Sequence, residues 1–310
     1  MVQLHKYSGA GNDFVVLDGR TEDVSEFRTP GRIAALCDRS TGFAAADGRI
    51  GADGLMILTD DPDYDFRMEY YNSDGSGGMM CGNGGRCIVA FADALGLAPA
   101  DGRVFRFVAA DGEHTGEILS RNGDCKTVRI RMIDVHEFHP ALDGWFLDTG
   151  TRHFVRFVPD VEAVDIEKEG RAARWDPVFA PIGANANFVS VLPDGTLHVR
   201  TFEKGVEGET LACGTGITAS AIAAFLASPR AEEPSFAGHE RSARQNLGVS
   251  GSTTPTHRSE GPAASFAGLT GESPVHVDIQ ARIARLAVDF RPGETCFTDV
   301  YLTGPADEIR

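Results

Sequence analysis

The sequence predicts an α/β protein of the α+β type that is built from two similar domains. The phrase Cys-Gly-X-Gly occurs twice, starting at Cys81 and at Cys213, and each copy runs directly into a helical pattern. Stretches with the composition of β-strands lie around both copies. We therefore expect two pseudo-symmetric domains, each with a mixed sheet and one buried helix, and an active site at the seam where the two cysteines face each other.

The two helices are predicted by different patterns. After Cys81, apolar residues recur at the spacing of one helix face and a glycine follows as a stop signal, namely Ile88, Phe91, Ala92, Leu95 and Gly96. The helix expected from Ile217 is apolar nearly all round, which is typical of a buried helix.

Strand patterns fill most of the remaining chain. Residues rich in β-branched and aromatic side chains predict strands at 14–17, 66–71, 104–108, 128–132, 153–158, 187–192, 275–279 and 283–290. Pro193, Asp194 and Gly195 predict a hairpin turn whose second strand leads to Glu203. The segment 228–274 is rich in Pro, Gly, Ser and Thr without a period, and we expect it to be a mostly disordered insertion.

Composition excludes several classes of protein. The formal net charge of −16 disfavours a nucleic-acid partner, because phosphate binding needs a basic surface. No apolar run reaches the roughly 18 residues that a membrane helix needs, and the first residues lack the apolar centre of a signal peptide. We expect a cytoplasmic protein with a small-molecule substrate, no membrane partner and reduced cysteines. Whether it is a monomer or a homodimer is left open.

The repeated cysteines carry the strongest chemical signal. A helix N-terminus stabilises a thiolate and lowers the pKa of a cysteine, and the following glycines let a carboxylate approach the free amides. Two acid/base thiols beside one anion site suit stereoinversion at a carbon next to a carboxylate. We interpret Cys37, Cys87, Cys125 and Cys296 as inert thiols.

Other polar residues admit two interpretations each. His153 and Glu203 are natural proton partners for a thiol pair, although either could be an ordinary core or surface residue. Asn12, Asn72 and Asn185 stand beside glycine-rich turns, where they could either stabilise the turn or bind a small zwitterion.

The chain lacks the common signatures of cofactor and metal sites. It contains neither a phosphate-binding G-x-x-x-x-G-K-[ST] phrase nor a dinucleotide fingerprint, and its cysteines do not have zinc-ligand spacing. No lysine stands in a setting that suggests a Schiff base. We expect no cofactor and no metal.

The residues resemble the diaminopimelate epimerase family. The resemblance rests on phrases spread over most of the chain outside 228–274: residues 9–14, 50–54, 72–76, 80–87, 150–153, 203–216 and 301–306. The phrase Cys-Gly-Asn-Gly-x-Arg-Cys is the strongest of them. In this family a curved sheet wraps around each central helix, and the last strand returns to the first domain. The resemblance therefore implies a first domain of 1–122 with a returning strand in 298–310, and a second domain of 123–297.

The resemblance also implies a cofactor-free, two-base epimerase that interconverts LL- and meso-diaminopimelate in lysine and cell-wall precursor synthesis. Cys81 and Cys213 would be the two bases, with His153 supporting the first and Glu203 the second. The substrate would be bound by side chains and by amides of the two helix N-termini, namely Asn12, Asn72, Gly82, Asn83, Asn185, Lys204, Gly214 and Thr215. Lys204 stands where the family usually has Arg, and Gly54 where many members have a substrate-binding Gln.

The paired cysteines are compatible with two other functions. A proline or hydroxyproline racemase would use the same fold, but Asn83 and the lead-in Glu209-Thr-Leu-Ala212 match the diaminopimelate type. In a non-catalytic thiol-redox protein, Cys81 and Cys213 would instead form a reversible disulfide. Hydrogen exchange at the substrate α-carbon separates these hypotheses, because a redox protein would show none.

Overall fold

The computed structural model describes residues 2–78, 80–228 and 273–310. The chain divides into two compact units. Unit 1 comprises Met1–Arg131, Ile283–Leu286 and Tyr301–Arg310, and unit 2 comprises Met132–Arg282 and Ala287–Val300. Helices and mixed sheets occur in both units, which confirms the α/β class. No helix in the described ranges is long and apolar enough to cross a membrane.

The strands of unit 1 form a closed barrel. They are β1 (His5–Gly9), β2 (Asn12–Asp18), β3 (Gly54–Thr59), β4 (Phe66–Asn72), β5 (Val104–Ala109), β6 (Gly112–Asn122), β7 (Cys125–Arg131) and β16 (Phe297–Glu308), whose residues from Tyr301 belong to this unit. Neighbours pair in that order, and β16 then pairs with β1 as well as with β7. The pairs β2–β3 and β4–β5 are parallel. The remaining neighbours in the barrel pair antiparallel, namely β1–β2, β3–β4, β5–β6, β6–β7, β7–β16 and β16–β1.

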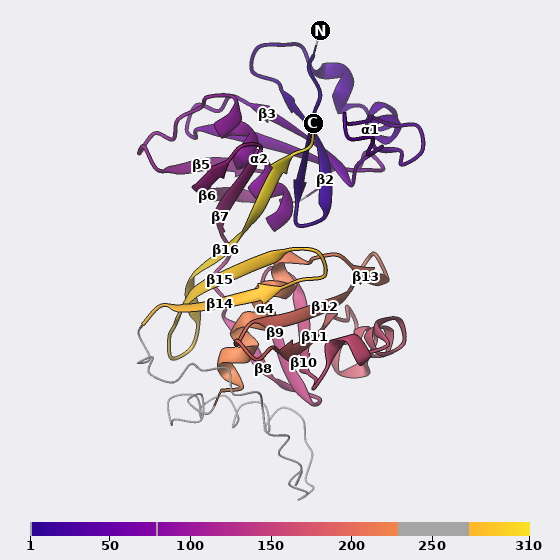
Figure 1. Cartoon of the computed structure of the whole chain (residues 1–310), viewed down its shortest axis with the longest axis vertical. Helices are drawn as coiled ribbons and strands as arrows, with labels where there is room; N and C mark the ends of the chain where they lie inside the picture. Colours follow the sequence, from indigo (N-terminus) through magenta and orange to yellow (C-terminus); the bar gives the residue numbers. More distant parts are fainter. Residues whose placement is uncertain (1, 79, 229–272) are drawn as a thin grey trace, which may run out of the picture. The chain divides into compact units, whose positions relative to one another are not determined.

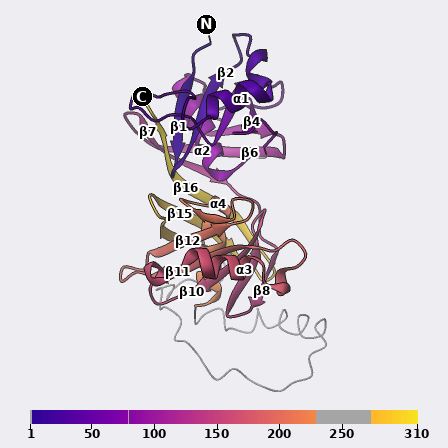
Figure 2. The same cartoon turned by 90° about the vertical axis from the view of Figure 1, so that its right-hand side faces the viewer.

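Helix α2 (Gly82–Ala94) packs against β1, β2, β3, β6 and β7. Figures 1 and 2 both show it surrounded by the strands of unit 1. Every residue from Gly82 to Ala92 is buried. The helix ends as predicted, because Gly96 has φ +78° and the amides of Gly96 and Leu97 bond to the carbonyls of Asp93 and Ala92.

The outer face of β2 and β3 carries a second apolar layer. Side chains such as Val15, Leu17, Leu55 and Ile57 are fully buried there. They pack under residues of η1 (Ser25–Arg28) and α1 (Pro30–Cys37). Alternate residues of each strand thus face the two layers, since successive side chains point to opposite faces of a sheet.

Unit 2 contains a sheet in the order β15-β14-β12-β11-β10-β9-β8, with β13 paired to β12. The strands are β8 (Glu137–Ala141), β9 (Gly144–Asp148), β10 (Arg152–Phe157), β11 (Asn185–Val191), β12 (Leu197–Glu203), β13 (Gly208–Thr210), β14 (Val275–Gln280) and β15 (Arg285–Pro292). The pairs β10–β11 and β12–β14 are parallel.

Helix α4 (Gly214–Leu226) packs against β9, β10, β11, β12 and β14 (Figure 2). All its residues from Gly216 onward are buried, as its uniformly apolar sequence predicts. The opposite face of the sheet buries aromatic side chains, including Phe146, Phe154 and Phe188, under short helices. These are η2 (Val161–Ala163), η3 (Ile166–Gly170), α3 (Arg171–Arg174) and η4 (Pro177–Phe179).

Each strand expected from the sequence is present, and the hairpin between β11 and β12 closes with the Leu192 amide bonded to the Thr196 carbonyl at 2.9 Å. The returning strand expected in 298–310 is β16. Strands β1, β3, β6, β8, β9 and β13 were not predicted individually. Of the insertion expected at 228–274, residues 229–272 lie outside the described residues, so its expected disorder stays a prediction, as does the pseudo-symmetry of the two domains.

Candidate active site

Cys81 is the N-cap residue of α2 in unit 1. Its backbone is extended, with φ −111° and ψ 152°, and its Sγ accepts a hydrogen bond from the Gly84 amide at 3.3 Å. The unpaired amides of a first helical turn and the positive end of the helix dipole stabilise negative charge at this position. The prediction that Cys81 stands at a helix N-terminus is confirmed.

A buried arginine lies beside this N-terminus. Arg86 is 0% exposed and donates to Asn83 Oδ1 at 2.8 Å and to the carbonyls of Gly82 and Pro305 at 3.3 Å each. Within the described ranges no carboxylate pairs with it. Burial lowers the pKa of Arg86 to about 10, while the neighbouring sulfur groups of Cys87 and Cys81 act in the opposite direction. The guanidinium is therefore still a cation at neutral pH.

Arg86 is the first member of a chain of side-chain hydrogen bonds. Asn83 Nδ2 donates to Asn12 Oδ1 at 2.6 Å, and Asn12 Nδ2 donates to Asp53 Oδ2 at 3.0 Å. The amides of Asn83 and Asn12 are thus oriented from both ends. Two residues that the sequence suggested for substrate binding, Asn12 and Asn83, are brought together in unit 1.

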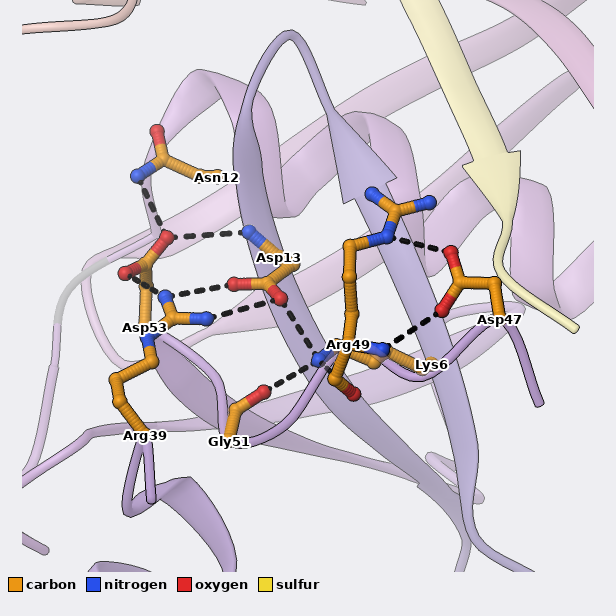
Figure 3. A network of polar contacts seen from close by, with 8 residues as sticks. All are labelled: Lys6, Asn12, Asp13, Arg39, Asp47, Arg49, Gly51 and Asp53. Carbon is orange, nitrogen blue, oxygen red and sulfur yellow. Dashed lines mark hydrogen bonds and ion pairs between the residues drawn. The ribbon is translucent and has the colours of Figure 1, made fainter. Parts of the chain in front are cut away.

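Beyond Asn12 these side-chain hydrogen bonds continue into a network of charged residues (Figure 3). Arg39 binds the carboxylates of both Asp13 and Asp53, with a distance of 2.7 Å to Asp13 Oδ1. Lys6 Nζ lies 2.9 Å from Asp13 Oδ2 and donates to the Gly51 carbonyl. The side chains of Lys6 and Asp13 are 0% and 7% exposed, so solvent screens their attraction weakly.

Asn72 belongs to a turn. Its Nδ2 donates to Ser76 Oγ at 2.9 Å, and its backbone amide donates to the Ser76 carbonyl at the same distance. The Gly75 amide bonds back to the Asn72 carbonyl. These contacts agree with the turn-stabilising interpretation of Asn72, and its role in binding stays a prediction.

Cys213 is the N-cap residue of α4 in unit 2, as predicted. Its Sγ lies 3.4 Å from the Thr215 hydroxyl oxygen. Packing explains why the second glycine of this phrase, Gly216, is needed. A Cβ at this position would collide with Asn187 Oδ1 and would lie 3.2 Å from His153 Cε1. Only glycine lets the helix approach these two side chains so closely.

His153 is fully buried on β10. Its Nδ1 lies 3.0 Å from Asn187 Nδ2, and its Nε2 lies 2.9 Å from the hydroxyl oxygens of both Thr151 and Thr215. Burial lowers the pKa of His153 to about 3, so the ring is neutral at physiological pH. Since these contacts all lie within unit 2, the expected pairing of His153 with Cys81 stays a prediction.

Glu203 and Lys204 follow each other at the end of β12. Burial raises the pKa of the Glu203 carboxyl above its ordinary value. Lys204 is exposed, and its backbone amide donates to Asn185 Oδ1 at 2.7 Å. The other end of the Asn185 amide donates to the Arg152 carbonyl at 3.1 Å, so this side chain is also fixed from both ends.

The structure thus groups Cys81, Asn12 and Asn83 in unit 1, and Cys213, Thr215, His153 and Asn185 in unit 2. Arg86 and Asn187 were not recognised from the sequence. Arg86 stands inside the phrase Cys-Gly-Asn-Gly-x-Arg-Cys, two residues after the repeated Cys-Gly-X-Gly, and Asn187 follows Asn185 by two residues on one strand. These two positions are the sequence signals that could have identified both residues.

Among the remaining cysteines, burial raises the pKa of the thiols of Cys37 and Cys87. Cys125 is exposed, and its pKa is raised to about 11 by a hydrogen bond with Asp307. Raised pKa values agree with the interpretation of these three as inert thiols.

Comparison with known sequences gives one consistent family. A family model described as diaminopimelate epimerase matches residues 4–127 and 145–240. The chain is 33% identical over 308 residues to a diaminopimelate epimerase of Flavobacterium psychrophilum, covering 99% of this chain and 98% of that one. A diaminopimelate epimerase of Chlorobaculum tepidum is 40% identical over 223 residues, covering 70% and 81%.

Solved structures share the fold at low sequence identity. A PhzF-family phenazine biosynthesis protein of Bacillus anthracis superposes with a TM-score of 0.62 at 14% identity, covering 99% of this chain and 96% of that one. A probable proline racemase of Agrobacterium radiobacter gives a TM-score of 0.56 at 16% identity, covering 99% and 90%. At these identities the structures support the fold, whereas the family follows from the sequences. On that basis the chain belongs to the diaminopimelate epimerase family of isomerases.

Proposed function

We propose that this chain interconverts LL- and meso-diaminopimelate without a cofactor, using Cys81 and Cys213 as two bases. One cysteine, as a thiolate, takes the α-proton of the substrate, and the other, as a thiol, delivers a proton to the opposite face of the same carbon. The observation that carries the proposal is that each cysteine is the N-cap residue of the buried helix of its unit, within a sequence that belongs to this family.

The helix N-termini address the main energetic problem of the reaction. The α-proton of an amino acid is very weakly acidic, so charge developing on the carboxylate in the transition state must be stabilised. We assign this task to the amides of Gly82 and Asn83 in α2 and of Gly214 and Thr215 in α4. Each well-placed donor contributes on the order of 3 kcal/mol, by analogy with oxyanion holes.

Further groups complete the proposed site. Glu203 would exchange protons with Cys213, which its raised pKa favours. Asn12 and Asn185, whose amides are held from both ends, would hold polar groups of the substrate at low entropic cost. Lys204, exposed at the end of β12, would meet the distal carboxylate as a point charge.

Proton exchange in deuterated water tests the proposal. Purified protein should exchange the α-proton of LL-diaminopimelate and form the meso isomer. Cys81→Ala and Cys213→Ala should each lower epimerisation by at least about 100-fold, because inversion needs a donor and an acceptor on opposite faces. Cys296→Ala is the matched control and should keep wild-type turnover.

The same assay separates the competing functions. Exchange with L-proline but not with diaminopimelate would indicate a proline-type racemase on the same fold. Absence of exchange with either substrate would favour a thiol-redox protein. Near-wild-type turnover in either cysteine variant would contradict the two-base mechanism.

A further inference from the structure

The side chain of Asn187 has a defined orientation. Its Nδ2 lies 3.0 Å from the carbonyl oxygen of Phe154, which can only accept a hydrogen bond, so the amide nitrogen must face it. The Thr201 hydroxyl donates to Asn187 Oδ1 at 2.9 Å. Asn187 and Thr201 are 0% and 4% exposed, so water does not compete for these groups.

This orientation fixes the proton on the His153 ring. The second N–H of Asn187 Nδ2 points to His153 Nδ1 at 3.0 Å, so Nδ1 must be the accepting nitrogen. A neutral imidazole carries one proton, and that proton is therefore on Nε2. If His153 were doubly protonated, its Nδ1–H would face the N–H of Asn187 Nδ2, and neither group could accept a hydrogen bond.

The Nε2 proton faces the N-terminus of α4. Nε2 lies 2.9 Å from both Thr215 Oγ1 and Thr151 Oγ1, so these two hydroxyl oxygens share the Nε2 proton, and Thr215 keeps its own proton to donate. Asn185 Nδ2 lies farther from Nε2, at 3.4 Å, and its two N–H groups have the Arg152 carbonyl and the Thr151 hydroxyl as acceptors. Cys213 Sγ lies 3.4 Å from Thr215 Oγ1, a normal length for a hydrogen bond to sulfur. Each residue thus donates a hydrogen bond to the next, from Asn187 to His153, from His153 to Thr215, and from Thr215 to the Cys213 sulfur.

We propose that Asn187 is a positioning residue, which holds His153 in its Nε2–H form so that His153, through the Thr215 hydroxyl, stabilises the Cys213 thiolate. The inference deepens the two-base function proposed above and rests on it. It differs from the role that the family resemblance implies for His153, that of a proton partner of Cys81. In the arrangement seen here Nδ1 is occupied by Asn187 and Nε2 carries a proton, so His153 donates a hydrogen bond and takes no proton.

The first experiment measures the tautomer directly. Nitrogen-15 NMR of wild-type protein labelled at histidine should show His153 as the neutral Nε2–H form. Asn187→Asp should shift it toward the Nδ1–H form, because a carboxylate at residue 187 accepts from Nδ1 instead of donating to it. A wild-type spectrum with the proton on Nδ1, or with both nitrogens protonated, would overturn the proposal.

The second experiment measures the thiols. Alkylation of Cys81 and Cys213 by iodoacetamide is followed by mass spectrometry in one sample at neutral pH. Thr215→Val should slow alkylation of Cys213 by about tenfold, the effect of one hydrogen bond to a charged group, whereas Thr215→Ser should restore it. Cys81 serves as the internal control and should keep its rate.

Neither measurement depends on turnover, so failure of the proposed function and failure of this inference are distinguishable. The two variants Thr215→Val and Thr215→Ser also keep the inference testable if Asn187→Asp does not fold. Unchanged alkylation of Cys213 in Thr215→Val, or slower alkylation of Cys81 instead, would overturn the proposal. The second result would return His153 to the role of a partner of Cys81.

Discussion

The ring of Tyr70 occupies the space in which a side chain at Gly54 would begin. Its Cε2 atom lies 2.7 Å, and its hydroxyl oxygen 3.1 Å, from the position that a Cβ on residue 54 would take. The carbonyl oxygen of Tyr71 lies 2.6 Å from the same point. The glutamine that many family members carry here does not fit this site while Tyr70 stands across the β3–β4 pair.

Gly54→Ala should therefore destabilise unit 1. The added methyl group must displace both a ring and a strand carbonyl, and overpacking of this kind costs about 1 to 3 kcal/mol. Urea denaturation followed by circular dichroism measures the loss. Gly77→Ala is the matched control, because a Cβ at Gly77 meets nothing within 4 Å. Equal stability of the two variants would contradict the prediction.

Asp53→Asn should weaken substrate binding through Asn12. The Asp53 carboxylate accepts from Asn12 Nδ2 at 3.0 Å and also binds Arg39, whereas a neutral amide cannot serve both donors equally. We expect KM to rise by about tenfold with a smaller change in kcat. Asp47→Asn is the control, because Asp47 binds Arg49 at the exposed edge of the same network, and it should leave KM unchanged.

Arg86→Met should reduce the reactivity of Cys81. The substitution keeps most of the side-chain volume but removes the buried positive charge and the donor to Asn83 Oδ1. Alkylation of Cys81 should slow by about tenfold, while that of Cys213 in unit 2 should not change. Arg32→Met provides the control, since Arg32 is exposed and stacks over Phe27. An unchanged rate for Cys81 would mean that Arg86 acts on structure alone.

The buried His153 should make stability depend on pH. Its pKa is lowered to about 3 in the folded protein from an ordinary value of 6.5, so between these values the unfolded chain binds a proton that the native chain does not. Stability should therefore fall as the pH drops below about 6.5, by up to about 1.4 kcal/mol per pH unit from this residue. Urea unfolding should show a shallower decline in His153→Gln, whereas exposed His136→Gln should follow the wild type.

Lys204 tests the identity of the substrate. If its ammonium binds the distal carboxylate of diaminopimelate, Lys204→Ala should lower kcat/KM. The fall should correspond to a loss of about 2 to 3 kcal/mol of transition-state stabilisation. Lys204→Arg should preserve activity, since guanidinium binds a carboxylate with two parallel hydrogen bonds. Unchanged kcat/KM for diaminopimelate in Lys204→Ala would indicate that a smaller amino acid is the substrate.

Local pattern was enough to predict the parts of the fold that depend on neighbours in the chain. The N-terminal position of Cys81 and Cys213, the stop at Gly96 and the hairpin at residues 192–197 all follow from residues within one or two turns of each other. Alternation revealed strands such as β7, whereas the polar β6 and the continuously apolar β3 lack a period that would identify them.

The sequence by itself therefore determined the two helix-capping thiols, the α/β class and the family to which the chain belongs. Only the tertiary structure decided that β16 closes the barrel of unit 1, that Arg86 orients Asn83 and Asn12, and that Asn187 holds His153. Apart from the Arg86–Asn83 bond within α2, these contacts join parts of the chain that are far apart in sequence, such as Asn12 and Asn83, or residues on neighbouring strands, such as His153 and Asn187. Their hydrogen-bond partners are set by strand register and burial, which a local pattern of residues does not contain.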